Sequence, residues 1–213
     1  ALLIADYAQI PVIPLMGQGR HWIRRHYCDE FAESHSKELA VRAALGAPLP
    51  TAGVGCAFRV EVLERVVGTD GPFPADSLTE DYELGLRLCA GGASAEFVRV
   101  ATADGRTIAS RGYFPDRISD AVRQKTRWLR GNALEGWQRI GWPHPPGASV
   151  GRLIVSWWML WRDRRAMLAA AAVLTGYGAV IIGLVALAIA WVANVPVTFG
   201  AEAAWLITAF NLL

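Results

Sequence analysis

A long apolar run near the C-terminal end constrains this sequence more than any other feature. From Ala166 to Gly200 the chain carries no Asp, Glu, Lys or Arg. About 20 apolar residues are enough for a helix to cross the hydrocarbon core of a bilayer. We therefore predict a transmembrane helix over residues 166–193, because a buried helix of a soluble domain seldom needs a charge-free run of this length.

The residues ahead of this run have the composition of a folded domain with a small positive charge. All 21 Lys and Arg and 18 of the 19 acidic residues precede Ala166, which leaves a net charge of +3. This mild excess argues against a nucleic-acid-binding protein. Cys28, Cys56 and Cys89 show neither a metal-binding spacing nor a disulfide framework, which fits a reducing compartment. The four histidines also lack the spacing of metal ligands.

Both ends of the sequence lie inside apolar runs. The chain begins with Ala1 in such a run and stops inside another, over residues 203–213. The second run is too short to cross a bilayer as it stands, and we expect it to begin a second transmembrane helix. We accordingly expect the chain to be the middle of a longer protein.

Short helical and extended patterns alternate between residues 1 and 147. We expect helices where apolar residues recur at helical spacing, and strands in short apolar runs. The expected helices cover residues 1–10, 26–45, 59–67, 77–89 and 115–140, and the expected strands cover residues 51–58, 96–101 and 107–111. Ser77 and Glu80 have the spacing of a capping box, which predicts a helix start at Ser77. The alternation predicts an α/β domain.

Tryptophan and arginine are concentrated between residues 148 and 165. Trp157, Trp158 and Trp161 occur in an apolar stretch that is too short to span a bilayer, and arginines flank it on both sides. Such residues favour the membrane interface, and arginines favour the cytoplasmic side of a span. We predict an interfacial amphipathic helix over residues 148–165; a core helix of the soluble domain is the alternative.

Asp81 is the first candidate for catalysis. It lies in the first turn of a predicted helix, between Glu80 and Glu83. Acidic residues there can simply stabilise the helix dipole. A carboxylate at the end of a rigid element can also act as a general base, and neighbouring acids raise its pKa toward neutrality. Taken alone, Asp81 does not decide between these two interpretations.

Gln124, Arg127 and Trp128 form the second candidate group. Their spacing places them on one face of a helix. Arginine binds phosphate oxygens, tryptophan offers a flat apolar surface to a sugar ring, and an amide can bond to sugar hydroxyls. The alternative is a basic amphipathic helix that faces lipid headgroups.

Together these two groups resemble processive family-2 glycosyltransferases, such as cellulose and hyaluronan synthases. The shared pattern is Thr79-Glu80-Asp81, then Gln-x-x-Arg-Trp at residues 124–128, then membrane helices. The resemblance implies the C-terminal half of a GT-A, Rossmann-like domain, with Asp81 as the catalytic base. It also implies substrate contacts from seven residues, with Arg127 on the diphosphate: Thr79, Glu80, Gln124, Arg127, Trp128, Gly55 and Cys56. Ordinary tight packing is the alternative role of the small-residue segment 53–58.

The segments 10–14, 29–33, 77–85 and 114–128 further resemble the bacteriophage adsorption protein B branch of this family. The resemblance covers residues 1–142 and implies a multi-pass protein of the bacterial inner membrane with a cytoplasmic catalytic part. It also implies synthesis of an exopolysaccharide that contains an N-acetylated hexosamine. Control by cyclic di-GMP belongs, in that branch, to a C-terminal domain that this chain does not include.

One family motif is missing from the chain. Family members bind the nucleotide-sugar donor and a divalent cation, Mg²⁺ or Mn²⁺, through an Asp-x-Asp motif, and no Asp-x-Asp occurs here. We therefore expect the donor-binding half to precede Ala1, with the metal ligands outside this chain. The expected partners are a nucleotide-sugar donor, a glycan acceptor and the lipid bilayer.

Two rival functions stay open at the level of sequence. The chain could be a non-catalytic inner-membrane component of a phage-adsorption or export assembly, with an outer-membrane partner. It could also be a membrane-surface anchor whose basic helix binds anionic lipid, although that function leaves Asp81 unexplained.

Overall fold

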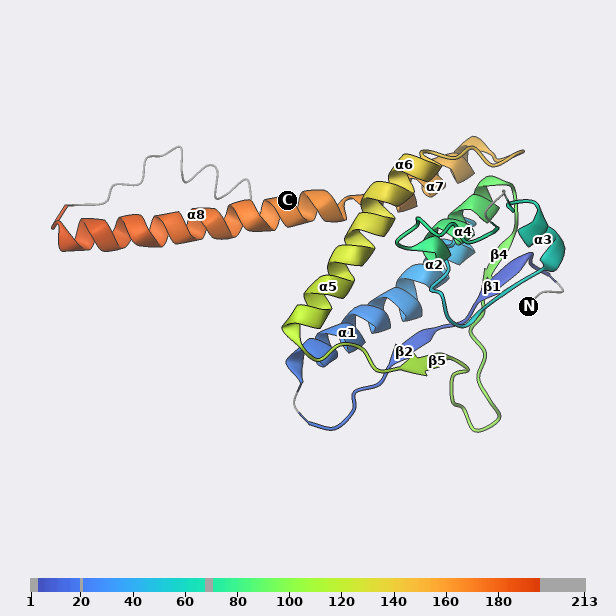
Figure 1. Cartoon of the computed structure of the whole chain (residues 1–213), viewed down its shortest axis with the longest axis horizontal. Helices are drawn as coiled ribbons and strands as arrows, with labels where there is room; N and C mark the ends of the chain where they lie inside the picture. The colour runs from blue at the N-terminus through green and yellow to red at the C-terminus, as the bar shows by residue number, and fades with distance from the viewer. Residues whose placement is uncertain (1–3, 20, 68–70, 196–213) are drawn as a thin grey trace. The chain divides into compact units, whose positions relative to one another are not determined.

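The computed structural model describes residues 4–19, 21–67 and 71–195. It separates into one unit that contains residues 1–167 and a second that contains residues 168–213. The first unit holds the β-strands and the helices α1 to α7, and most of helix α8 belongs to the second (Figure 1). The mixed α/β content of the first unit confirms the predicted fold class at this level.

The first described segment forms strands, so the helix predicted for residues 1–10 is wrong where the structure describes it. Strand β1 (Tyr7–Gln9) is the middle strand of a three-stranded sheet and is buried along its whole length. It pairs antiparallel with β3 (Cys56–Phe58) and parallel with β4 (Ala95–Phe97). A strand that is buried on both faces shows no alternation of apolar and polar residues, so periodicity does not distinguish it from a buried helix.

Strand β2 (Val12–Pro14) pairs in parallel with β5 (Ser110–Gly112) to form a second, two-stranded sheet. The strand predicted over residues 51–58 is confirmed only for its last three residues. Gly53 and Gly55 have φ angles of +69° and +66°, which lie outside the extended region and turn residues 51–55 into a loop.

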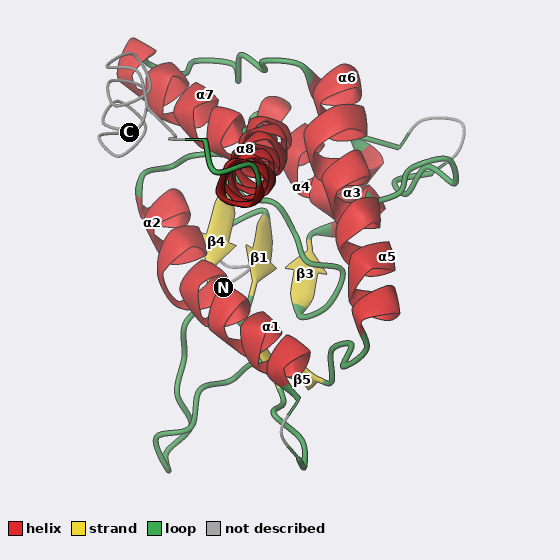
Figure 2. Cartoon of the chain, turned by 90° about the vertical axis from the view of Figure 1, so that its left-hand side faces the viewer, coloured by secondary structure: helices red, strands yellow, loops and turns green. Residues whose placement is uncertain are grey.

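Two long helical segments contain a π-helical turn each. The first consists of α1 (Trp22–Glu33), the π-helix η1 (Ser34–Glu38) and α2 (Leu39–Ala44). The second consists of α5 (Ile118–Trp128), the π-helix η2 (Leu129–Glu135) and α6 (Gly136–Ile140). Figure 2 shows these segments on either side of the three-stranded sheet. The structure confirms the helices predicted over residues 26–45 and 115–140. The π-helical turns inside them were not predicted.

The N-cap of helix α4 (Glu80–Ala90) lies two residues later than Ser77, the N-cap that the capping-box pattern predicts. Thr79 is the N-cap residue, and its side chain makes no capping hydrogen bond. Ser77 instead donates its hydroxyl hydrogen to Glu83 Oε1 at 2.8 Å. Asp81 lies in the first turn of α4, as predicted, and α4 follows the short helix α3 (Val60–Glu64) in the chain.

The hydrophobic core of the first unit lies between α2, α4 and the three-stranded sheet. Its buried members are Tyr7, Leu39, Leu49, Val62, Leu84, Leu88, Cys89, Ala93 and Phe97. Tyr7 donates its hydroxyl hydrogen to the backbone oxygen of Gly85 in α4 at 3.0 Å. A Cβ atom on Gly85 would lie 2.6 Å from the Leu49 backbone oxygen, so this glycine permits the close packing of α4 on residues 49–51.

Helix α7 (Val150–Arg164) is amphipathic. Ser156, Met159 and Leu160 are buried, whereas Ile154 and Trp158 are exposed. The helix therefore packs on the α/β unit with one face and exposes apolar side chains on another, so it combines features of both interpretations drawn from the sequence.

Helix α8 (Ala166–Val192) is 27 residues long and has a mean hydropathy of 2.3 in its most apolar window. By length and composition it is a candidate membrane span among the described residues. Its bounds agree with the span predicted over residues 166–193. The second span expected over residues 203–213 lies outside the described residues.

Candidate functional site

Residues from distant parts of the sequence meet around a cavity of about 870 Å³ in the first unit. Its wall includes Asp81 at the start of α4, and Arg127 and Trp128 at the end of α5. The loop over residues 50–54, the helical segment from α1 to α2 and the end of α7 complete the wall. The structure therefore brings Asp81 together with Arg127 and Trp128, two of the three residues in the second candidate group.

The carboxylate of Asp81 is held by its immediate neighbours. Its Oδ1 atom accepts a hydrogen bond from the backbone N–H of Tyr82 at 2.8 Å. The hydroxyl of Thr51 donates to the backbone oxygen of Asp81 at 2.7 Å. A Cβ atom on Gly53 would lie 2.8 Å from Asp81 Oδ2, so the carboxylate rests directly against a backbone that only glycine leaves open.

Burial raises the pKa of Asp81 above the ordinary value of an aspartate. The hydrogen bond from Tyr82 lowers this pKa, the charge of Glu80 raises it, and the charge of Arg127 lowers it. A carboxylate with a raised pKa is a better proton acceptor once it is ionised, which suits the role of a general base.

The loop beside Asp81 is fixed by a buried glutamine that the sequence analysis did not single out. Gln9 in β1 accepts a hydrogen bond from the Ala52 N–H at 2.9 Å through its side-chain oxygen. Its side-chain nitrogen donates to the Val54 backbone oxygen at 2.9 Å. Gln9 is fully buried, so the central strand of the sheet sets the position of the loop against which Asp81 rests.

Arg127 and Trp128 contribute a cation and an aromatic surface. Among the described residues, no carboxylate lies within ion-pair distance of Arg127, so its guanidinium is available to an anion. Trp128 packs against two aromatic rings of α1, with centroid distances of 6.2 Å to Tyr27 and 6.0 Å to Phe31. These contacts fix the indole while it lines the cavity.

Thr79 brings α4 and the π-helix η2 into close contact. Its side chain is 5% exposed and lies against Gly131. A Cβ atom on Gly131 would lie 2.3 Å from Thr79 Oγ1 and 2.5 Å from Thr79 Cγ2. The glycine therefore permits the approach of the helix that carries Arg127 to the segment that carries Asp81. Thr79 and Glu80 also line the cavity.

Three residues predicted to contact substrate do not line this cavity. Gln124 has a buried side-chain oxygen with no hydrogen-bond partner in the described part of the chain. Gly55 packs against Ile10, because a Cβ atom on Gly55 would lie 2.7 Å from Ile10 Cγ1. Cys56 belongs to strand β3. The small residue that lies against Asp81 is Gly53, because the loop turns before the strand begins.

The cavity also includes polar residues that the sequence did not identify as part of a site. Burial lowers the pKa of His35 to about 4, so its imidazole is neutral at physiological pH. Its Nδ1 atom accepts from the Val12 N–H at 3.3 Å, which places the proton on Nε2. Arg42 and Asp163 form an ion pair in the same wall. The sequence predicted that Arg42 and Asp163 belong to helices. It did not predict their ion pair, because the two residues lie 121 positions apart.

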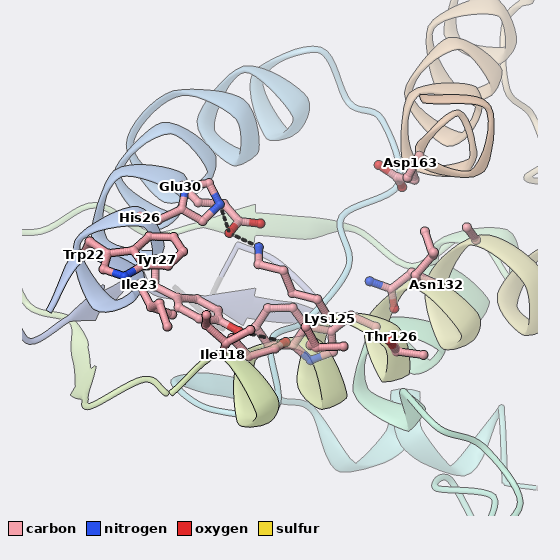
Figure 3. A pocket seen from close by; sticks show the side chains of 16 residues that line it. Trp22, Ile23, His26, Tyr27, Glu30, Ile118, Lys125, Thr126, Asn132 and Asp163 are labelled. Carbon is pink, nitrogen blue, oxygen red and sulfur yellow. Dashed lines mark hydrogen bonds and ion pairs between the residues drawn. The ribbon is translucent and has the colours of Figure 1, made fainter. Parts of the chain in front are cut away.

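A second, mainly apolar groove of about 640 Å³ adjoins this cavity. It runs between α1 and α5 and ends at the beginning of α8. Figure 3 shows Trp22 at one end and Asn132 with Asp163 at the other, with the ion pair between Lys125 and Glu30 in between. Trp128 and Asp163 belong to both walls, so the two hollows are neighbours.

The described residues do not make a metal site by themselves. No three side chains of His, Cys, Asp or Glu in that part of the chain are grouped so that they could hold a metal ion. Glu80 and Asp81 are the acidic pair at the start of α4, and both line the cavity.

Comparison with known proteins gives two related findings. Residues 4–202 match the model of the glycosyl transferase family group 2. The chain is also 38% identical, over 178 aligned residues, to bacteriophage adsorption protein B of Escherichia coli strain K12 and to bacteriophage N4 adsorption protein B of Escherichia coli O157:H7. Each alignment covers 75% of this chain and 23% of the relative, so the chain spans about a quarter of their length.

Proposed function

The chain belongs to the glycosyl transferase family group 2, and from this premise we propose that it forms the acceptor and catalytic half of an inverting sugar transferase. The observation that carries the proposal is the cavity that gathers Asp81, Arg127 and Trp128. In this proposal residues 1–147 are the second half of a GT-A domain, and the donor nucleotide-sugar is bound mainly by residues outside this chain.

In the proposed reaction, separate residues accept the proton, stabilise the leaving diphosphate and support the acceptor sugar. The carboxylate of Asp81 takes the proton from an acceptor hydroxyl, whose oxygen forms a bond to the anomeric carbon of the donor sugar. The bond from that carbon to the diphosphate breaks, and the electron pair leaves with the diphosphate. Arg127 stabilises the negative charge that develops there, and Trp128 supports the acceptor sugar ring.

The membrane arrangement is part of the same proposal. Helix α8 is the span, and the exposed tryptophans of α7 contact the bilayer interface. The catalytic unit then lies on the cytoplasmic side of a multi-pass inner-membrane protein, where nucleotide-sugars are made. The product is an exopolysaccharide, and Mg²⁺ or Mn²⁺ bound by residues elsewhere in the protein assists the donor.

An Asp81→Asn variant of the protein at its natural full length tests the catalytic role. The amide keeps the shape of the carboxylate but cannot accept the proton, so sugar transfer should fall at least about 100-fold, the usual contribution of a general base. Incorporation of radiolabelled sugar into polymer by membrane vesicles measures this. Membrane insertion and nucleotide-diphosphate affinity should stay at wild-type levels. Transfer at the wild-type rate would refute the assignment of Asp81.

The names of the two relatives favour a second function. Both are named for bacteriophage adsorption, so the chain could act as a docking component without catalysis. The same Asp81→Asn variant separates the two functions in cells that carry it as their only copy. Full phage sensitivity without polymer would favour docking, whereas loss of both would tie phage adsorption to the transferred sugar.

A further inference from the structure

One partly buried carboxylate outside the catalytic motifs is linked to both segments that surround Asp81, directly to α4 through Tyr82 and indirectly to the loop over residues 48–53 through Arg42. It belongs to Asp163, near the end of α7 and three residues before α8 begins. Its side chain is 14% exposed and lines the same cavity as Asp81. Its charge is compensated by a bidentate contact from Arg42, whose two terminal nitrogens lie 3.0 and 2.9 Å from the carboxylate oxygens.

The first tether runs from Asp163 to the helix that carries Asp81. Tyr82 in α4 donates its hydroxyl hydrogen to Asp163 Oδ2 at 2.6 Å. Tyr82 is also the residue whose backbone N–H binds the Asp81 carboxylate. The tyrosine therefore joins the two carboxylates through its own side chain and backbone.

The second tether runs from Asp163 to the loop on which the Asp81 carboxylate rests. Arg42 is 2% exposed, and its Nε atom donates to the Pro48 backbone oxygen. Residues 48–53 continue from there to Thr51, which binds the Asp81 backbone, and to Gly53, which touches its carboxylate. A buried charge pair with complete hydrogen bonding is costly to rearrange, so both segments are held rigidly.

We infer that Asp163 is a positioning residue for Asp81: by binding Tyr82 and Arg42 together, it fixes the helix that carries the base and the loop that supports it. This inference rests on the proposed function for the role of Asp81, but the double tether can be tested without activity. Through the same contacts, Asp163 links the position of Asp81 to the segment that leads into α8.

Two variants test the inference in the protein at its natural full length. Tyr82→Phe removes one hydrogen bond and keeps the ring, and Asp163→Asn removes the charge. Tyr113→Phe is the control for the hydroxyl, since that ring is 69% exposed. Asp76→Asn is the control for the charge, because Asp76 makes a similar pair with Arg139 at the surface.

Hydrogen–deuterium exchange measures the tethers directly. Tyr82→Phe should increase exchange at residues 79–84 severalfold, Asp163→Asn should increase it at residues 48–53 as well, and the controls should do neither. Unchanged exchange in both segments would overturn the inference. If the wild-type protein transfers no sugar, the proposed function fails while this measurement still decides whether Asp163 holds both segments.

Kinetics separates positioning from a purely structural role. Tyr82→Phe should lower kcat about tenfold with KM unchanged, because a small displacement of the base affects the transition state more than binding. The acid limb of the pH profile should move to lower pH as Asp81 becomes better hydrated, while its charged neighbours Glu80 and Arg127 are retained. A lower melting temperature with unchanged kcat and unchanged pH profile would show that Asp163 only stabilises the fold.

Discussion

Replacing Gly131 with alanine tests the close contact between η2 and Thr79. The new methyl group would lie 2.3 Å from Thr79 Oγ1, and an ordinary contact requires about 3.4 Å. The two segments must therefore separate by about 1 Å, and a misplacement of that size can reduce catalysis about 100-fold. Because Thr79 is the N-cap of the helix that carries Asp81, the separation moves the base away from Arg127.

Two opposing contributions determine how Gly131→Ala changes the free energy of unfolding. Alanine is favoured over glycine inside a helix by about 1 kcal/mol. Forcing a methyl group into a filled contact costs about 1–3 kcal/mol, and a 2.3 Å approach belongs at the upper end of that range. The expected net loss is about 1–2 kcal/mol, or a fall of a few degrees in melting temperature for a chain of this size.

Gly151→Ala is the matched control, because a Cβ atom there meets nothing within 4 Å in the helix α7. This variant should keep the wild-type transfer rate and gain up to about 1 kcal/mol of stability. Thermal unfolding in detergent and radiolabelled sugar transfer measure the two quantities. If Gly131→Ala is as stable and as active as Gly151→Ala, the contact with Thr79 does not set the position of Asp81.

Three further variants should separate binding, stability and support of the base. Arg127→Ala should weaken UDP binding measured by calorimetry by about 10- to 100-fold, the usual effect of losing a hydrogen bond to a charged group, and unchanged affinity would remove Arg127 from the diphosphate site. Asp81→Asn should raise the melting temperature at pH 7, because burial raises the pKa of Asp81 and the ionised form destabilises the fold. That gain should vanish below about pH 4, where the carboxyl group is protonated in both states, and an equal gain at every pH would contradict the cause. Gly53→Ala should cost about 1–2 kcal/mol from its φ of +69° and displace the Asp81 carboxylate, so the rate of transfer should fall while UDP affinity is retained.

Most helices of this chain could be predicted from local patterns, because the apolar run that begins at Ala166 and the helical spacing of residues 26–45 and 115–140 depend on neighbours within the same helix. The sequence also singled out Asp81, Arg127 and Trp128, which the fold brings to one cavity, but it did not show that Gln124 lies outside that cavity. Strand β1 could not be identified, since its burial on both faces depends on partners about 50 and 90 residues away in the sequence. The loop at Gly53 was mistaken for a strand because an apolar run of small residues does not reveal positive φ angles.

The tethers around the candidate base could not be predicted for a different reason. Asp163 lies among arginines in the sequence, and its partner Arg42 is 121 positions away. A charged residue that is surrounded by charged neighbours looks solvated when only its own helix is considered. Tertiary packing alone brings this ion pair into the interior of the domain.

Each of the two helical segments that line the cavity contains a π-helical turn. The directions of its side chains therefore depend on the number of residues in the segment as well as on their types. Each residue of an α-helix advances the face by about 100°. Deleting a single residue within η2 would remove the wide π-helical turn and change the direction of Gly131 relative to Arg127, so Gly131 could no longer lie against Thr79 while Arg127 faces the cavity. In natural variation of this family, substitutions between Trp128 and Gly136, Gly131 excepted, should therefore be tolerated more readily than a one-residue gap.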